Sequence, residues 1–128
     1  MNIQINDGLP FTEVTLIHRG KTLTLDRVLI DTGSAGTIFD VDVLAKIDLL
    51  PEPEDSIHTI TGVGGSEFVV EKKVEQIKIM SLEIADFTIE IGTMDYGLEL
   101  HGIIGFNFLI RTKAIIDPEQ LKIYSNLS

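Results

Sequence analysis

The chain has 128 residues, a normal length for one domain, and we expect residues 1–128 to form a single domain. Ten basic and twenty acidic residues give a formal net charge of −10, which argues against nucleic acid or an anionic membrane as the main partner. The chain contains no cysteine, so disulfides, thiolate metal sites and a thiol nucleophile are excluded.

Two further features bear on location. Residues 1–4 lack the basic segment and the apolar run of a signal peptide. The longest uncharged stretch, residues 100–110, is too short to span a bilayer. Because the absence of cysteine also suits a reducing compartment, we expect a cytoplasmic protein.

The first part of the chain predicts β-strands. Residues 11–18 are rich in Val, Ile, Thr and Phe, residues 19–21 are typical of a turn, and residues 22–25 alternate apolar and polar side chains. Residues 28–30 form an unbroken apolar run, as expected of a strand buried on both faces. This run ends at Asp31.

A short helix and an acidic loop are predicted next. Asp40 is a suitable N-cap for a helix that continues to about Ile47. Residues 51–55, Pro-Glu-Pro-Glu-Asp, are typical of an exposed, solvated acidic loop, and weak binding of a divalent cation there stays an alternative.

Two hairpins follow. Residues 57–70 place strand-forming residues on both sides of a glycine-rich centre, Gly62-Val63-Gly64-Gly65, which predicts a hairpin with a mobile tip. Residues 74–80 and 84–91 alternate apolar and polar side chains, which predicts another antiparallel pair.

The last part of the chain predicts a strand, a helical turn and a hairpin. Residues 103–105 repeat the pattern of an apolar strand that ends in glycine, and residues 106–110 predict about one helical turn. Residues 114–117 and 121–124 flank Pro118-Glu119-Gln120, which predicts a final hairpin. The expected fold is therefore all-β with one or two short helices.

A faint internal duplication accompanies this pattern. An apolar strand leads to Asp31 and then to a helix, and a later apolar strand leads to Gly105 and then to a helix. The repetition predicts two related halves packed about a pseudo-twofold axis, with Gly105 at the position that corresponds to Asp31.

The candidate catalytic motif is Asp31-Thr32-Gly33. As a bare tripeptide it is equally typical of an ordinary turn at the end of a strand, because Asp and Gly are common turn residues. Its surroundings favour a functional site. The carboxylate follows a rigid, buried strand, Gly33 lets backbone amides approach it, and Thr32 and Ser34 supply nearby hydroxyls.

Three segments, in order and at similar spacing, resemble the retroviral-protease-like (retropepsin-like) family of aspartic proteases. They are residues 29–37 (Leu-Ile-Asp-Thr-Gly-Ser-Ala-Gly-Thr), residues 61–65 (Thr-Gly-Val-Gly-Gly) and residues 102–109 (Gly-Ile-Ile-Gly-Phe-Asn-Phe-Leu). The resemblance covers roughly residues 11–124, and its last part is closer to cellular and bacterial members than to the short viral enzymes. It implies a closed β-barrel, the single lobe of the acid protease fold, and an aspartic endopeptidase without a metal or cofactor.

The resemblance also implies roles for individual residues. Asp31 would be the acid and base. Thr32 would hydrogen-bond across a dimer axis, Gly33 would place its N–H near the carboxylate, and Ser34 would bond the outer carboxylate oxygen. The flap that covers an extended peptide substrate would be Thr61, Gly62, Val63, Gly64 and Gly65, and the psi-shaped loop would include Ile104, Gly105 and Asn107.

A protease of this kind needs a second copy of the chain. Hydrolysis without a metal or a nucleophile requires one group to activate water and another to protonate the leaving group. Two carboxylates ~3 Å apart that share one proton can do both. The chain has one Asp-Thr-Gly motif, so we expect a homodimer in which each copy contributes Asp31.

Other functions are less well supported. The main alternative is a catalytically weak protease-like fold that binds peptides or mediates dimerisation. His18, His58 and His101 lack metal-ligand spacing, and the serines lack a Gly-x-Ser-x-Gly context. Phe106 and Phe108 are expected in the core. The flap lacks a Tyr, and the terminal segments do not match the interlocked strands of viral dimers.

Overall fold

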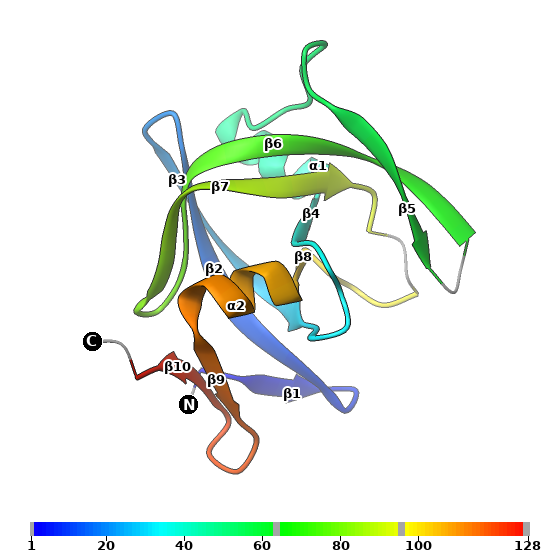
Figure 1. Ribbon diagram of the computed structural model, residues 1–128. Coiled ribbons are helices and arrows are strands. Elements are labelled where there is room, and N and C mark those ends of the chain that lie inside the picture. The colour runs from blue at the N-terminus through cyan, green and yellow to red at the C-terminus, as the bar shows by residue number, and fades with distance from the viewer. Residues whose placement is uncertain (1, 63–64, 95–96, 127–128) are drawn as a thin grey trace.

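A computed structural model describes residues 2–62, 65–94 and 97–126 (Figure 1). Strands account for most of this part, and the helices are short. The strands are β1 (Gln4–Asn6), β2 (Leu9–His18), β3 (Lys21–Ile30), β4 (Ile38–Asp40), β5 (Ile57–Gly62), β6 (Gly65–Ile79), β7 (Leu82–Gly92), β8 (Gly102–Ile104), β9 (Ala114–Asp117) and β10 (Lys122–Ser125). The helices are α1 (Val41–Leu44), the 3₁₀ turn η1 (Ala45–Ile47) and α2 (Phe106–Thr112).

The main sheet closes on itself. Its strand order is β1-β2-β3-β8-β4-β7-β6-β5, and β2 also pairs with β6. The six strands β2, β3, β8, β4, β7 and β6 therefore form a closed barrel. Strands β1 and β5 are attached outside this ring, and β9 and β10 form a separate two-stranded sheet. The predicted all-β, closed-barrel fold is confirmed.

The barrel has a twofold internal pattern that differs from the predicted one. Each half contains an antiparallel hairpin, β2–β3 or β6–β7, and a short third strand that pairs in parallel with the hairpin of the other half: β8 with β3, and β4 with β7. Strand β8 therefore corresponds to β4, not to β3. The predicted equivalence of Gly105 and Asp31 was wrong, because a sequence repeat does not reveal which strand inserts into which half.

A β-bulge in β3 sets the direction of its last residues. The pairing with β2 shifts between Thr12 and Val14, and Arg27 has a positive φ of 53°. Leu25 faces the core before the bulge, and Val28 and Ile30 face it afterwards. The two predicted strands, residues 22–25 and 28–30, are therefore one strand with a bulge at residues 26–27, and this strand leads to Asp31.

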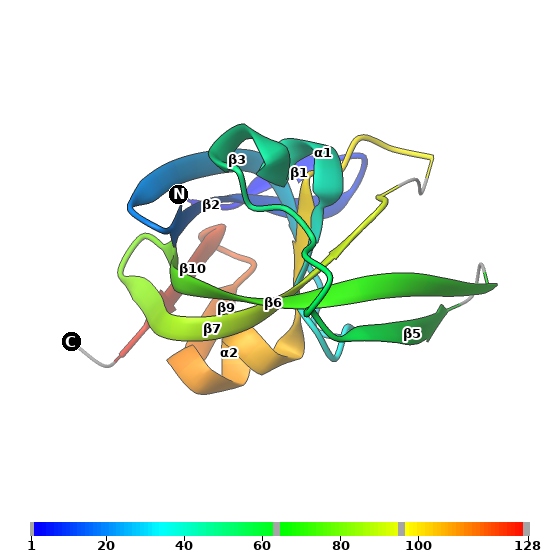
Figure 2. The same cartoon turned by 90° about the horizontal axis from the view of Figure 1, so that it is seen from above.

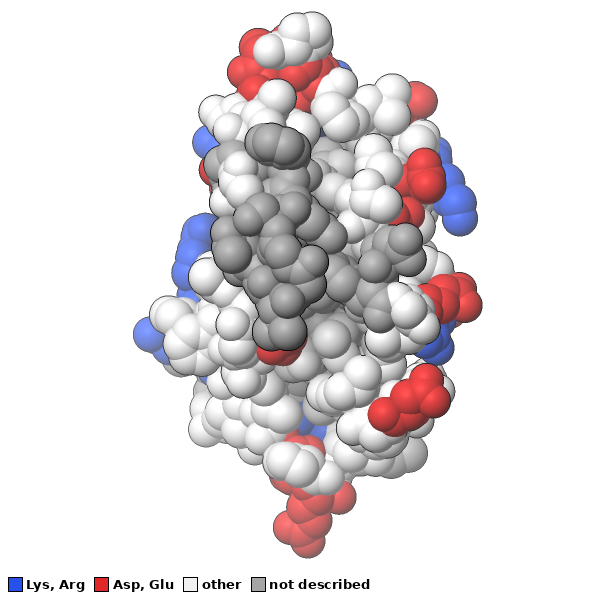
Figure 3. All heavy atoms as spheres, turned by 90° about the vertical axis from the view of Figure 1, so that its right-hand side faces the viewer, with Lys and Arg blue, Asp and Glu red and all other residues white. Residues whose placement is uncertain are grey.

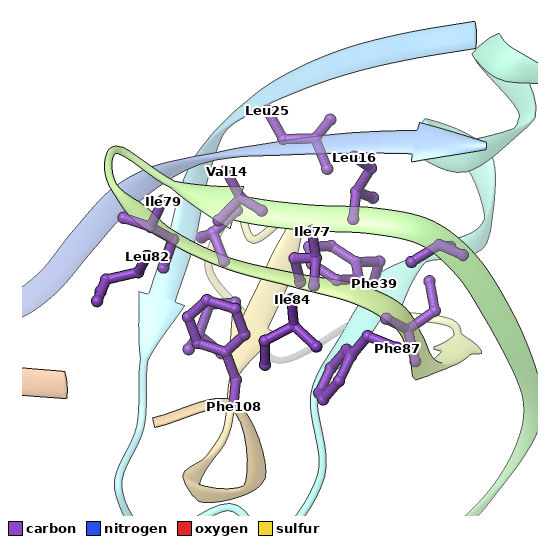
Figure 4. Close-up of a cluster of buried hydrophobic side chains, with 14 of the residues drawn as sticks. Val14, Leu16, Leu25, Phe39, Ile77, Ile79, Leu82, Ile84, Phe87 and Phe108 are labelled. Atoms are coloured by element: carbon purple, nitrogen blue, oxygen red, sulfur yellow. The ribbon is translucent and has the colours of Figure 1, made fainter. Parts of the chain in front are cut away.

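The main core lies inside the barrel (Figure 4). It includes side chains from every barrel strand and from α2, such as Leu16, Phe39, Ile77 and Phe108. A second, smaller apolar cluster lies on the other face of the central strands, and Leu29 packs against it. The run of residues 28–30 is thus covered on both faces, as predicted.

Strand β6 is longer than the sequence pattern predicted. The predicted hairpins of residues 57–70 and 74–91 share this one continuous strand, which pairs with β5 at its start and with β7 further along. Residues 65–69 of β6, which come before Val70, pair with β5 alone, and this hairpin projects away from the barrel (Figure 2).

The helices differ in detail from their predictions. Asp40 occupies the N-cap of α1 but makes no side-chain capping bond, and its Oδ1 accepts a 3.4 Å hydrogen bond from the Met94 amide instead. In α2, Phe108 is fully buried, whereas Phe106 is 48% exposed, so its predicted place in the core was wrong. No helix in the described ranges is long and apolar enough to cross a membrane.

Candidate active site

Asp31 lies directly after β3, where β3 and β8 run parallel and end side by side. Its amide donates a hydrogen bond to the Ile104 carbonyl (2.9 Å), which continues the pairing of the two strands. Asp31 is half-buried, whereas Thr32 and Gly33 are exposed. The carboxylate is therefore carried by the rigid barrel and still reaches the surface.

Hydrogen bonds between residues close in sequence shape the loop that begins at Asp31. The Ser34 amide donates to the Asp31 carbonyl (3.1 Å), and the Gly33 amide donates to Asp31 Oδ1 (2.9 Å). A Cβ at position 33 would lie 3.2 Å from the same oxygen, so a larger residue would crowd the carboxylate. The Gly33 N–H lies near the carboxylate, where the family resemblance expects it.

The second loop of the site passes directly against the first. The Phe106 amide donates to the Ser34 carbonyl (2.6 Å), and a Cβ at Gly105 would lie 1.9 Å from the Gly36 carbonyl oxygen. Such a distance is far inside van der Waals contact. Gly105 therefore allows two backbones to approach more closely than any side chain would permit.

A buried hydroxyl connects the two loops. Thr37 is fully buried, its Oγ1 donates to Asn107 Oδ1 (2.8 Å), and it accepts a bond from the Gly105 amide (3.0 Å). Asn107 Oδ1 also accepts from the Phe108 amide at the start of α2 (2.9 Å). Thr37 was not predicted as a site residue, although a hydroxyl directly before the apolar strand β4 needs hydrogen-bond partners when it is buried.

Ser34 has a different partner from the expected one. Its Oγ donates to the Gly36 carbonyl (2.8 Å) rather than to the Asp31 carboxylate. The hydroxyl has a single proton, so this bond uses its donor. In this arrangement Ser34 supports the backbone of the loop instead of the carboxylate.

The β5–β6 hairpin lies on the same side of the barrel as the Asp31 loop (Figures 1 and 2). Its register runs from Ile57 opposite Val70 to Gly62 opposite Gly65, which confirms the predicted hairpin. Val63 and Gly64, the predicted tip, lie outside the described residues. Thr61, Gly62 and Gly65 form the last described pairs before the tip.

Apolar side chains lie beside the Asp31 loop. The small cluster on the outer face of β3, β4 and β8 contains Ile38, and the half-buried Leu29 and Ile103 pack against it. Leu29 and Ile103 are direct neighbours in the parallel pair, two residues before Asp31 and Gly105. In Figure 3, the acidic and basic groups that are visible lie mainly toward the edges of the face that is drawn.

The histidines and carboxylates do not gather into a metal site in the described part of the chain, where no three His, Cys, Asp or Glu residues could hold an ion. His101 instead contacts Asp26 (Nδ1 to Oδ1, 3.1 Å) and Glu99 (Nε2 to Oε1, 3.4 Å). His18 is buried at the end of β2.

Comparison with known proteins agrees with this geometry. Residues 14–108 match the family described as Aspartyl protease. A search of curated proteins finds no match. The matched region runs from β2 to α2, most of the chain, and contains Asp31, the β5–β6 hairpin and Gly105. The chain therefore belongs to the retropepsin-like aspartyl protease family.

Proposed function

We propose that this protein is an aspartic endopeptidase whose active site is completed by a second copy of the chain. The observation that carries the proposal is the placement of Asp31. The carboxylate follows two parallel strands and accepts a bond from the Gly33 amide, and the loop that begins at Asp31 lies on the same side of the barrel as the β5–β6 hairpin (Figures 1 and 2). Membership of an aspartyl protease family supports the same reading.

The need for two copies follows from the chemistry. One carboxylate activates water and the other protonates the leaving nitrogen, and a pair that shares one proton can exchange these tasks. Each chain has one Asp-Thr-Gly motif. A twofold dimer would bring both Asp31 residues to its axis, and their titration would then belong to the pair.

We assign roles to the other site residues on this basis. Asp31 is the catalytic acid and base, the exposed Thr32 faces the second copy, and Gly33 orients the carboxylate. Ser34, Ile104, Gly105 and Asn107 hold the two loops together, and we add Thr37 to this group. Thr61, Gly62, Val63, Gly64 and Gly65 form the flap.

The substrate of this reaction would be an extended peptide. Such a peptide pairs its backbone with the flap and places alternate side chains in pockets. The half-buried Leu29 and Ile103 beside Asp31 favour apolar side chains next to the cleaved bond. Closure of the flap would exclude bulk water during the reaction.

The domain and location predictions remain proposals. A single domain is supported because Ile3 and Ile123, near the two ends, belong to the same core as Val14. A cytoplasmic location stays a prediction from the sequence.

Peptide cleavage tests the proposal. An unstructured peptide library is incubated with wild type, Asp31→Asn and Asp42→Asn at several pH values between mildly acidic and neutral. We expect Asp31→Asn to lose about 10³-fold or more in rate, the usual scale of general acid–base catalysis, and Asp42→Asn, an exposed helix residue, to match wild type. Equal cleavage by all three proteins would contradict the proposal.

A mixing experiment tests the second copy. Excess Asp31→Asn is equilibrated with a fixed amount of wild type. A parallel sample receives the same excess of Asp42→Asn, which keeps Asp31, and serves as the control for total protein. If two chains complete the site, mixed dimers with one carboxylate lower the activity per wild-type chain. If activity stays constant while mixed dimers form, each chain works alone. Folded dimers without cleavage by wild type would favour the peptide-binding alternative.

A further inference from the structure

Lys72 has an unusual environment on β6. Its side chain is 6% exposed and shares a strand face with the core residue Val74. In the part of the chain that the structure describes, it is the one Lys, Arg, Asp or Glu that is buried. Burial of an ammonium group is costly unless the group is paired.

The partners of Lys72 come from the loop that precedes β5. Its Nζ bonds Glu52 Oε1 and Asp55 Oδ2, the latter at 2.9 Å. Glu52 also pairs with Arg19 at 3.0 Å. The predicted solvated acidic loop was therefore wrong for these two carboxylates. Their side chains are only 30% and 13% exposed, and both are paired.

The acidic loop is itself a closed turn. The Glu52 amide donates to Asp55 Oδ2 (2.7 Å), and the Asp55 amide donates to the Glu52 carbonyl (3.0 Å). The same Asp55 oxygen accepts from Lys72. One ammonium group thus holds a preformed turn against β6.

This turn leads directly into the projecting hairpin. The Glu71 amide donates to the Ser56 carbonyl (2.9 Å), and Ile57 pairs with Val70. Val70 is also the first residue of β6 that pairs with β7, opposite Ile91. Lys72 therefore lies two residues inside the point at which the hairpin leaves the barrel, and its contacts hold the strand that enters the hairpin.

We propose that Lys72 is a positioning residue that fixes the root of the β5–β6 hairpin and so sets where the hairpin lies over Asp31. An apolar side chain of similar size often stabilises a fold as well as a buried ion pair does. The directional contacts of one ammonium group with two carboxylates instead define where the turn lies on β6. The effect on substrate binding rests on the proposed function, whereas the effect on β5 does not.

Hydrogen exchange of the folded dimer or chain tests the structural part. Lys72→Met removes the charge and keeps the length, Lys72→Arg keeps the charge, and Lys21→Met is a matched control because Lys21 forms an exposed pair with Asp48. We expect Lys72→Met to speed exchange of the β5 amides about tenfold, on the scale of a lost charged hydrogen bond, with the β2–β3 amides unchanged. Lys72→Arg should restore slow exchange, and Lys21→Met should not alter β5.

Peptide kinetics test the functional part. With Lys72→Met we expect KM to rise about tenfold with a smaller change in kcat, because a displaced flap weakens binding of substrate and transition state alike. Lys72→Arg should recover most of the loss. A merely structural role would lower the amount of active protein, and hence the apparent kcat, without a change in KM.

Further variants keep the test decisive if Lys72→Met does not fold. Asp55→Asn and Glu52→Gln remove one partner at a time, and each should speed exchange in β5 to a smaller degree. Uniformly faster exchange along the chain, or unchanged β5 in all folded variants, would overturn the proposal. If exchange changes as expected but wild type cleaves no peptide, the positioning role stands and the protease function fails. If wild type cleaves peptides but exchange in β5 is unchanged in the variants, the protease function stands and the positioning role fails.

Discussion

At the scale of single residues, the site depends on very close approach of two backbones. Gly105 lies where a Cβ would meet the Gly36 and Ser34 carbonyls, at 1.9 and 2.8 Å. Because both neighbours are backbone atoms, they cannot move aside without a change in the Asp31 loop. At Gly36 a Cβ would instead meet the side chain of Glu90.

We therefore expect Gly105→Ala to destabilise the protein by about 2–4 kcal/mol, the range for overpacking in a rigid site. Gly36→Ala should cost less, because the Glu90 side chain can change rotamer. Urea denaturation of both variants measures the difference. Equal stability of Gly105→Ala and wild type would show that the two loops are not in the described contact.

His18 predicts a pH dependence of stability. Burial lowers its pKa below 6.5, and the nearby positive charges of Arg19 and Lys72 lower it further, against smaller opposite effects of Glu75 and Glu52. Its Nε2 has no partner among the described residues. The folded protein thus disfavours the protonated imidazole, whereas the unfolded chain accepts the proton.

The sign follows from this difference. The His18 contribution to stability is fully present above about pH 6.5 and decreases as the pH falls from there through the folded pKa, by at most about 1.4 kcal/mol per pH unit. The hydrogen bond from Lys72 lowers the pKa of Glu52 to about 2. The stability that Glu52 contributes therefore decreases only below its ordinary pKa of 4.5. Urea midpoints between pH 7.5 and 5 measure the effect, and His18→Leu should flatten the curve in this range. An equal slope in both proteins would assign the effect to other groups.

At the scale of elements, the two ends of the chain are tied to each other. The Asn2 side chain donates to the Ile123 carbonyl and accepts from the Ile123 amide, both at 2.8 Å. β1 pairs with β2, and β10 pairs with β9, within the same chain. The terminal strands therefore have partners in one copy, unlike the interlocked strands of viral dimers.

Replacement of Asn2 tests this tie. Asn2→Ala removes both side-chain bonds to β10, and we expect a loss of about 1–2 kcal/mol in the free energy of unfolding. Gln4→Ala changes an exposed residue of β1 and should have little effect. Thermal or urea unfolding compares the two, and exchange of the β10 amides should rise only in Asn2→Ala. A larger effect of Gln4→Ala would contradict the described contact.

At the scale of the whole molecule, the proposed reaction depends on association. If two chains form the site, specific activity falls on dilution once most chains are monomeric, and the rate then varies with the square of the concentration. Sedimentation over the same range should show the loss of dimer at the same concentration. Constant specific activity across a range in which sedimentation finds only monomer would contradict a two-chain site.

The sequence by itself determined much of this protein. Asp31 after an apolar run, the glycine-rich centre of residues 62–65 and the apolar strand before Gly105 identified the family and the hairpin, because turn chemistry and side-chain periodicity are local properties. Tertiary structure alone decided which strands pair, so it revealed the exchange of β4 and β8 between the halves. It also decided which polar groups meet across the chain, as Lys72 does with Glu52 and Thr37 with Asn107. These contacts join residues far apart in the sequence, and the closure of the barrel, which no local pattern encodes, brings them together.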